Sequence, residues 1–191
     1  MRVSRQKAAE NRERIIEAAG ALFRSKGFSG IGVADIMKAA DLTHGGFYGH
    51  FDSKDDLVAE ASQQVMAHAA ANWTKTVADA PTDPYGALLA RYLSPHHRDD
   101  PGRGCVFAAL GADAARSGSL VRKAFGDGLE ALIDILSEAI PAASKTARRR
   151  KAVAAMAGLV GALLLARAVG DKKLSDEILE ATRKELNAAG C

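Results

Sequence analysis

The 191-residue chain contains little cysteine, few aromatic residues and no apolar run long enough to span a bilayer. With two cysteines, one of them at the last position, nothing indicates a disulfide framework. The longest apolar stretch, Ala152 to Ala166, falls short of the roughly 20 residues that a transmembrane helix needs. The N-terminus is basic and is followed by charged residues instead of an apolar segment, so no secretory signal is expected. These absences predict a cytoplasmic protein without membrane association.

Aromatic residues account for only 5% of the chain, and the apolar–polar alternation typical of strands is hard to find. Alanine, leucine, isoleucine and valine are abundant. The formal net charge of +3 excludes a nonspecific polycation. A length of 191 residues fits one small domain joined to one larger domain, and together these features predict an all-α fold.

The segment from residue 27 to residue 57 predicts two short helices joined by a tight turn, with a third helix directly afterwards. Asp41 stands at the turn, and Asp tolerates left-handed backbone better than most residues. Thr43 is a suitable N-cap for the second short helix, in which Phe47 and Phe51 point inward. Such a pair is the helix-turn-helix unit, whose second helix can enter a DNA major groove. The inner face of the first short helix is predicted to comprise Val33, Ile36, Met37 and Ala40.

This region resembles the DNA-binding domain of the TetR/AcrR family of bacterial transcriptional regulators. The resemblance runs from RERIIEAAGALFRSKGF, through VADIMKAADLTHGGFYGHF, to SKDDL, over about the first third of the chain. It implies a three-helix DNA-binding domain over residues 1–53 and a helical ligand-binding and dimerisation domain over residues 54–191. It also implies a regulator and not an enzyme, most simply a repressor that leaves its operator when a small-molecule effector binds. Activation stays open as the alternative.

The sequence departs from the family pattern at the turn and in the second short helix. Asp41 stands where glycine is usual, and Gly32 stands where Ser or Thr would cap the helix that follows. Gly46 replaces a residue that is commonly Thr, Ser or Ala, so the predicted recognition helix holds Gly45, Gly46 and Gly49. Each interior glycine costs about 1 kcal/mol of helix propensity relative to Ala. We therefore expect a helix that is marginal alone and whose backbone approaches DNA closely.

Candidate DNA contacts follow from the resemblance and from side-chain chemistry. Tyr48, His50 and Lys54 match family positions that commonly touch the phosphate backbone, and each carries a suitable donor. Base reading is expected from Thr43, His44 and neighbours in the preceding helix. The alternatives are a Tyr48 ring packed in the core and an ordinary surface role for His44. The complete predicted contact set is Thr43, His44, Gly45, Gly46, Tyr48, His50 and Lys54.

The first fourteen residues are locally basic and predict an arm that reaches phosphates or a minor groove. A frayed, solvated terminus is the alternative. The basic residues of this segment are Arg2, Arg5, Lys7, Arg12 and Arg14.

Capping residues divide the remainder into helices. One helix is expected from about Cys105 to Arg116, another ends at Pro141, and SPHHRDDPGRG before them is predicted as a loop. The residues predicted to cap or open helices are Ser53, Pro84, Ser144 and Ser175, the last with a hydrophobic staple from Leu174.

The helix after Ser144 has small residues along one face and more large apolar residues than one face can hide in a monomer. The alternative is a central buried helix. The resemblance favours a homodimer through the last two helices, formed as a four-helix bundle, that binds a palindromic operator in double-stranded DNA. The small residues are Ala154, Ala157, Gly158, Gly161 and Ala162, and the large ones are Val153, Met156, Val160, Leu163 and Leu164.

The resemblance also implies an effector pocket in the larger domain. Any one of its candidate residues is equally a plain core residue, and no carboxylate or basic constellation specifies an effector. No cofactor and no metal ion are expected. The predicted lining is Met66, Trp73, Tyr92, Cys105, Phe107, Phe125, Leu129 and Met156.

Cys105 stands at the predicted start of a helix, and a helix N-terminus with nearby cations lowers the pKa of a thiol. The segment GCVFAALG is similar to a subgroup of the family in which some members sense electrophiles or oxidants through such a cysteine. A small buried apolar residue is the alternative. The cationic candidates for its surroundings are His96, His97, Arg98, Arg103, Lys172 and Lys173.

Other classes of function find less support. His96, His97 and Cys105 include metal-binding side chains, but a fourth ligand and a familiar zinc spacing are missing. The run KTARRRK is more typical of a solvated first turn than of a second nucleic-acid surface. A protein-interaction module without DNA affinity is the remaining alternative.

Overall fold

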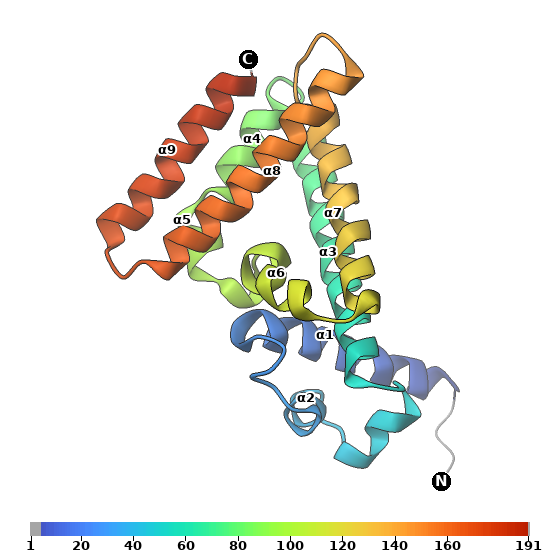
Figure 1. Cartoon of the computed structure of the whole chain (residues 1–191). Coiled ribbons are helices and arrows are strands. Elements are labelled where there is room, and N and C mark those ends of the chain that lie inside the picture. Colours follow the sequence, from blue (N-terminus) through green and yellow to red (C-terminus); the bar gives the residue numbers. More distant parts are fainter. Residues whose placement is uncertain (1–4, 191) are drawn as a thin grey trace.

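The computed structural model describes residues 5–190 and is built from helices (Figure 1). No β-strand occurs in this part of the chain, which agrees with the expected all-α fold. In chain order, with η for 3-10 helices, the elements are α1 (Arg5–Lys26), α2 (Val33–Ala39), η1 (His44–Gly49), α3 (Lys54–Asp79), α4 (Pro84–Tyr92), α5 (Pro95–Asp99), η2 (Pro101–Arg103), α6 (Val106–Arg116), α7 (Ser119–Ala139), α8 (Lys145–Ala168) and α9 (Lys172–Gly190).

Helices α1, α2 and η1 lie together at one end of the molecule, and the long α3 leaves this unit to pack along α7 (Figure 1). At the other end α8 packs against α7 and α9, and α4 packs against α3 and α9. Helix α6 lies between the two ends and contacts α1 on one side and α8 on the other. Two routes therefore join the ends, one along α3 and one through α1 and α6.

Side-chain caps define several helix starts as predicted. The Ser53 hydroxyl oxygen accepts a hydrogen bond from the Asp56 N–H at 3.1 Å at the start of α3. The Ser144 hydroxyl oxygen accepts one from the Ala147 N–H at 3.2 Å at the start of α8. Pro84 is the first residue of α4. Local sequence signals are thus sufficient for these boundaries.

The predicted cap of the last helix is wrong. Helix α9 begins at Lys172, where the Asp171 carboxylate accepts a hydrogen bond from the Leu174 N–H at 3.1 Å. Ser175 is buried and donates instead to the Ala166 carbonyl at 2.6 Å. Leu174 is too exposed to form the predicted staple. Asp171 caps α9 because its carboxylate accepts from an N–H group of the first turn, which has no partner within the helix. The Ser175 hydroxyl instead links α9 to the Ala166 carbonyl of α8.

The segment SPHHRDDPGRG, predicted as a loop, contains α5 and η2. Proline opens both elements, after Ser94 and Asp100 as caps. Arg98 of α5 is buried and forms ion pairs with Asp99 at 2.7 Å and with Asp176 of α9 at 2.5 Å. Hydrogen bonds to these two carboxylates raise the pKa of Arg98. The segment is therefore fixed to α9 at a defined position.

Two buried apolar clusters hold the helices together. The first contains the predicted inner residues Ile36 and Met37 with Phe47 and Phe51, and it continues into α6 and α7. The second is formed mainly by α4, α7 and α8. Because the first cluster reaches Phe125 of α7, the N-terminal unit rests on the larger helical body rather than hanging from a linker.

Helix α8 is long and apolar enough to cross a membrane by length and composition, the one such helix among residues 5–190. Its most apolar window has a mean hydropathy of 1.6 and is 39% buried. The apolar run Ala152 to Ala166 is only part of this helix of 24 residues, which is why the sequence prediction judged it too short. Helix α8 packs against α6, α7 and α9, as a core helix of a bundle does.

Candidate DNA-binding surface and ligand pocket

The predicted recognition helix is η1, a 3-10 helix rather than an α-helix. Thr43 occupies the N-cap position, but its side chain makes no capping hydrogen bond. Glycine at positions 45, 46 and 49 explains the irregular helix, because each disfavours a regular α-helical turn. A Cβ atom built at Gly45 or Gly49 meets nothing within 4 Å, so the backbone is open to a close partner there.

The turn before η1 has the predicted left-handed geometry. Asp41 has a φ of 56°, the region that Asp tolerates. Gly32, which stands where the family usually has a side-chain cap, is the N-cap of α2. Its N–H donates to the Asp35 carboxylate at 3.1 Å, so the helix caps itself from within its first turn.

Tyr48 is the most exposed large side chain on this surface, with 71% of its area accessible. Its ring packs edge-on against Phe47, with ring centroids 5.2 Å apart, and Phe47 is fully buried. The alternative of a Tyr48 ring inside the core is therefore wrong. Thr43 and His44 are exposed as well, whereas Gly46 and His50 are half-buried. Thr43, His44 and Tyr48 are thus accessible to a partner, and Tyr48 rests on the buried ring of Phe47.

Lys54 behaves differently from the other predicted contacts. Its ammonium group donates to the Phe28 and Ile31 carbonyls, each at 2.5 Å. These bonds tie the first turn of α3 to the loop between α1 and α2, with the ammonium directed toward the protein. Lys54 therefore positions the DNA-binding unit relative to α3 in this structure.

The basic N-terminal segment is mostly helical, because α1 begins at Arg5, and Arg2 lies outside the described residues. Arg12 forms an ion pair with Glu60 of α3 at 2.5 Å and lies over the Phe51 ring. Arg14 lies 3.6 Å from the Asp41 carboxylate. Two of the predicted arm residues thus stabilise the unit itself.

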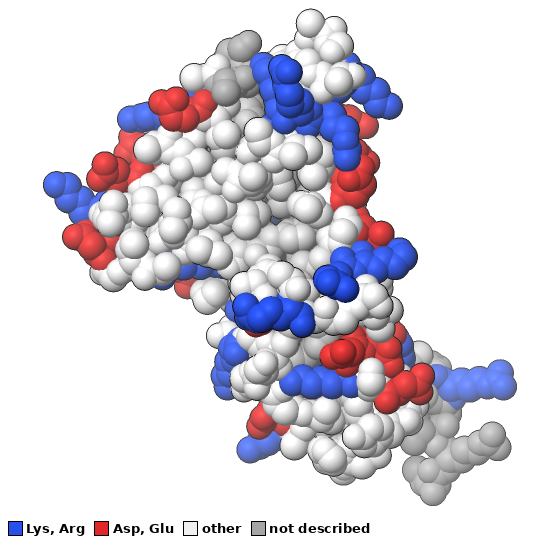
Figure 2. Space-filling model, in the orientation of Figure 1, with Lys and Arg blue, Asp and Glu red and all other residues white. Residues whose placement is uncertain are grey.

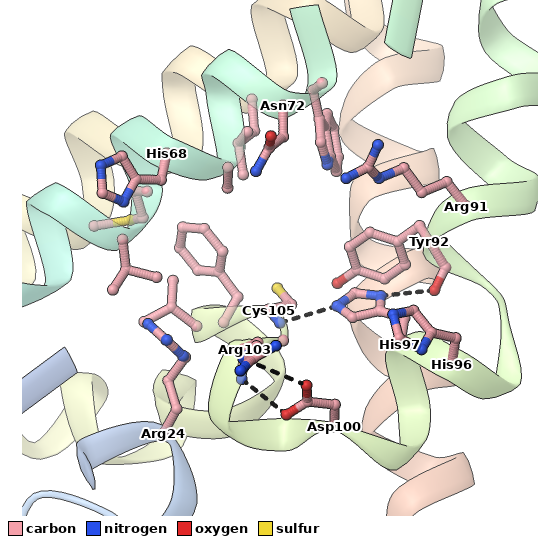
Figure 3. A pocket seen from close by; sticks show the side chains of 18 residues that line it. Arg24, His68, Asn72, Arg91, Tyr92, His96, His97, Asp100, Arg103 and Cys105 are labelled. Atoms are coloured by element: carbon pink, nitrogen blue, oxygen red, sulfur yellow. Dashed lines mark hydrogen bonds and ion pairs between the residues drawn. The ribbon is translucent and has the colours of Figure 1, made fainter. Parts of the chain in front are cut away.

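A cavity of about 410 Å³ lies among α3, α4, α5, η2 and α6 (Figure 3). Its volume is within the range typical of small-molecule sites. Among the predicted residues, those that line it are Met66, Trp73, Tyr92, Cys105 and Phe107.

The other predicted lining residues lie elsewhere, and the prediction for them is wrong. Phe125 packs edge-on against Phe107 and Phe28, behind the cavity wall. Leu129 packs against the second apolar cluster, and Met156 is buried within it. These residues were predicted from size and helical position, which do not show toward which neighbour a helix face is turned.

The predicted lining of the cavity omitted its polar residues, although His96, His97 and Arg103 were expected near Cys105 and do line the cavity with it. Figure 3 shows charged and polar side chains entering it from several elements, including Arg24 of α1. The cluster of charges in SPHHRDDPGRG was a usable signal, because part of that segment forms one wall. Arg24 carried no signal, since only the packing of α1 against η2 brings it there. The additional polar residues are Arg24, His68, Asn72, Arg91, His96, His97, Asp100 and Arg103.

His97 joins three elements of the pocket wall. Its Nδ1–H donates to the Tyr92 carbonyl at 2.7 Å, and its Nε2 accepts a hydrogen bond from the Cys105 N–H at 3.0 Å. The second bond requires the neutral ring, because a protonated Nε2 would face another N–H group. Burial lowers the pKa of His97, which agrees with a neutral imidazole.

Cys105 is the N-cap of α6, close to the predicted helix start, but its environment is not the predicted one. Burial raises the pKa of its thiol, and the opposing effect of the Tyr92 hydroxyl is smaller. Arg98 is turned away toward Asp99 and Asp176, so it does not contribute. Lys172 and Lys173 are not among the residues that line the cavity. The prediction of a lowered thiol pKa is therefore wrong, because desolvation outweighs the nearby charges.

A metal site finds no geometric support in residues 5–190. No group of three or more His, Cys, Asp or Glu side chains lies in an arrangement able to hold a metal ion. Both nitrogens of His97 are already used in backbone hydrogen bonds.

Comparison with known proteins agrees with this geometry. The family model "Bacterial regulatory proteins, tetR family" matches residues 15–61, which include α2, η1 and the first turns of α3. The HTH-type transcriptional regulator AcrR of Shigella flexneri is 41% identical over 59 residues, 31% of this chain and 27% of AcrR. The crystal structure of the reduced form of E. coli NemR superposes with a TM-score of 0.79 over 93% of this chain and 95% of that one, at 22% identity.

Residues 15–61 therefore form a DNA-binding domain of the TetR type. A further TetR-type relative is the HTH-type transcriptional repressor DhaR of Mycobacterium sp. (strain GP1), 27% identical over 111 residues. That alignment covers 58% of this chain and 56% of DhaR, so the chain spans about half of that relative's length. By name these relatives are transcriptional regulators, which agrees with the expectation that the protein is not an enzyme.

The chain also has an apolar outer face on α8 and α9. Figure 2 shows a broad surface over these helices with few charged side chains, bordered by lysine, arginine and acidic residues. Val153, Leu164 and Leu165 of α8 are between 42% and 52% exposed. Gly161 lies between them in sequence, and a Cβ atom there meets nothing within 4 Å. Isolated exposed leucines are ordinary, but a stripe along one helix is typical of an interface.

Proposed function

We propose that the protein is a TetR-like transcriptional repressor that binds a double-stranded DNA operator and is released by a small-molecule effector. The observation that carries the proposal is η1: a glycine-rich element with exposed donors, held on the buried rings of Phe47 and Phe51. The name of DhaR, a transcriptional repressor, supports repression over activation. A regulator of this kind acts in the cytoplasm.

The proposed DNA contacts divide by chemistry. The Tyr48 hydroxyl and the His50 ring donate to phosphates, while Thr43 and His44 approach base edges. Gly45 and Gly46 bring the backbone close to the DNA, because they place no bulky side chain between. Lys54 acts indirectly by fixing the unit to α3 through the carbonyls that it contacts.

The proposed assembly is a homodimer in which the exposed apolar stripe of α8, with α9, packs against its copy. A closed two-fold interface would remove Leu164 and Leu165 from water. It would also place two η1 elements on one DNA face, where half-sites lie about 34–36 Å apart. A palindromic operator follows from this symmetry.

The proposed release mechanism uses the two connections between the ends of the molecule. Helix α3 carries Lys54 at one end and Met66 and Trp73 of the cavity wall further along. Arg24 of α1 joins the η2 side of the cavity through the Gly102 carbonyl at 2.7 Å. An effector that binds one arrangement of these helices better than the other shifts the separation of the two η1 elements. Tenfold weaker DNA binding needs about 1.4 kcal/mol of such coupling.

Fluorescence anisotropy tests the central proposal. The protein is titrated on the DNA upstream of its own gene and on a scrambled duplex at two salt concentrations. We expect specific, salt-sensitive binding that saturates at two subunits or a multiple per site. Equal binding to both duplexes, followed by a random-sequence selection that enriches no motif, would contradict it.

Thiol modification at Cys105 is the second candidate for the release signal. The supporting observation is that Cys105 lines the cavity and caps α6, which contacts α1. The raised pKa of the thiol implies slow reaction at neutral pH, so this route needs a strongly reactive electrophile. Stoichiometric alkylation of Cys105 that leaves DNA affinity unchanged would exclude it.

A further inference from the structure

The cavity has an excess of positive charge. Its lining includes Arg24, Arg91 and Arg103 but only one carboxylate, Asp100. Arg167 of α8 adds a guanidinium whose charge acts on Tyr92 and Cys105. The apolar part of the cavity wall strengthens such a field, because apolar side chains screen charge weakly.

Among the described residues, Arg24 lines the cavity without an ion-pair partner. Its Nε donates to the Gly102 carbonyl at 2.7 Å, but its Nη1 is buried without a hydrogen-bond partner. Asp100 attracts it electrostatically, yet within residues 5–190 Arg24 forms no ion pair, and Asp100 lies 3.9 Å from Arg103 instead. Burial lowers the pKa of Arg24. Arg24 as a whole is half-buried, but a buried guanidinium N–H without an acceptor is costly unless something pairs with it.

Tyr92 provides a second polar group that is only weakly satisfied. The side chain is 4% exposed, and in the described part of the chain its hydroxyl has no nitrogen or oxygen partner and interacts with the Cys105 thiol, a weak acceptor. Burial raises the pKa of Tyr92 well above its ordinary value, so the hydroxyl stays a neutral donor. In Figure 3, Arg24 lies at one end of the cavity and Tyr92 at the other, with Cys105 between them. The aromatic residues Trp73 and Phe107 complete an apolar middle section.

We propose that this cavity binds an organic anion with a flat apolar body, whose anionic group is held by Arg24. The apolar body lies against Trp73 and Phe107, and an acceptor atom at its far end takes a hydrogen bond from Tyr92. Arg24 belongs to the N-terminal unit and the remaining lining to the helical body, so the ligand contacts both. The inference rests on the proposed function in that it takes this cavity as the effector site.

Two aromatic probes that differ by one sulfonate test the charge requirement. The anionic probe is 8-anilinonaphthalene-1-sulfonate, and its neutral analogue is N-phenyl-1-naphthylamine. Both fluoresce in apolar sites, and the chain has one tryptophan, Trp73, in the cavity wall. Energy transfer from Trp73 therefore reports binding at this cavity. We expect the wild-type protein to bind the sulfonate at least about tenfold more tightly than the neutral analogue.

Substitution of Arg24 identifies the group responsible. Arg24→Gln should weaken binding of the sulfonate about tenfold or more and leave binding of the neutral analogue unchanged. Arg24→Lys should be intermediate, because it keeps the charge but not the planar fork. Arg122→Gln, an exposed arginine of α7 outside the cavity lining, is the matched control and should change neither affinity. Unchanged binding of the neutral analogue also shows that the variants are folded.

Three results would overturn the proposal: equal affinity of the two probes, equal weakening of both by Arg24→Gln, or the same effect from Arg122→Gln. DNA anisotropy in the same samples separates this inference from the proposed function. Specific DNA binding without preference for the sulfonate rejects only the anion site. Preference for the sulfonate without specific DNA binding rejects only the regulator.

Discussion

The surface around η1 and the cavity beside α6 both present tyrosine and histidine, but they hold these side chains in opposite ways. Tyr48 is 71% exposed and packs against the buried ring of Phe47, whereas Tyr92 is 4% exposed and its hydroxyl lies inside the protein. His44 is exposed, while His97 uses both ring nitrogens in backbone hydrogen bonds. The same residue types therefore suit an open, hydrated partner at one end and an enclosed ligand at the other.

This difference shows that burial, more than residue type, decides what a polar side chain can do. An exposed donor can exchange water for a phosphate at little cost. A buried donor without a partner is destabilising until a ligand satisfies it. The first arrangement fits fast, reversible DNA contact, and the second fits recognition of one class of small molecule.

The largest effect is expected when the buried Phe47 ring, which supports the exposed Tyr48 side chain, is removed. Phe47→Ala should destabilise the N-terminal unit by about 3–5 kcal/mol, because the ring is fully buried. Specific DNA binding should be lost, while Trp73 fluorescence keeps its native emission. Chemical denaturation and anisotropy measure both effects. Tyr48→Phe is the control: it should weaken DNA binding without loss of stability, and an equally unstable Tyr48→Phe would contradict the contrast between the two rings.

A second test applies the same contrast to apolar side chains. Leu165 is 52% exposed in the single chain, so Leu165→Glu should leave the folded protomer intact and destabilise the dimer by about 2 kcal/mol or more. Sedimentation or light scattering across a concentration series measures the shift to monomer. Leu120→Glu, on α7 and 48% exposed, is the matched control and should not affect association. Similar dissociation in both variants would contradict an interface on α8 and α9.

A smaller effect is expected of pH on the stability of the folded protein. The neutral form of His97 is favoured on folding, since its pKa is lowered from 6.5. The unfolded chain therefore binds more protons near that pH, and stability should fall as the pH drops below about 6.5. Thermal unfolding between pH 7.5 and pH 5.5 measures the decrease, which should be reduced in His97→Gln. His96→Gln is the control; if it abolishes the pH dependence as well, His97 is not its source.

The smallest effect concerns the open backbone of η1. The Cβ atom added by Gly45→Ala meets no atom within 4 Å, so the substitution should stabilise the protein by up to about 1 kcal/mol through helix propensity. DNA affinity should fall, because the methyl group keeps the backbone away from its partner. Gly30→Ala provides the contrast, since its Cβ would lie 2.2 Å from the Lys26 carbonyl, and it should destabilise. Tighter DNA binding by Gly45→Ala would show that close backbone approach is not used.

Local signals in the sequence were sufficient for the N-terminal unit and for most of the long helices, but not for α5, η2 or the start of α9. Apolar spacing identified Ile36 and Met37 as core, and Ser53 and Ser144 were correctly read as caps. These features depend on residues within one or two helical turns of each other, which is the range that a sequence pattern describes. The glycines likewise indicated a weak recognition element before η1 was known to be a 3-10 helix.

Only the tertiary structure decided the chemistry of the cavity. Arg24 enters it because α1 packs against η2, and Cys105 has a raised thiol pKa because surrounding helices exclude water. Phe125 and Met156 were predicted to line it and lie in the core instead. Burial and charge pairing depend on residues far apart in the chain, so no local pattern contains them. The sequence alone thus determined the DNA-binding unit and most of the helices, and packing determined what the cavity can hold.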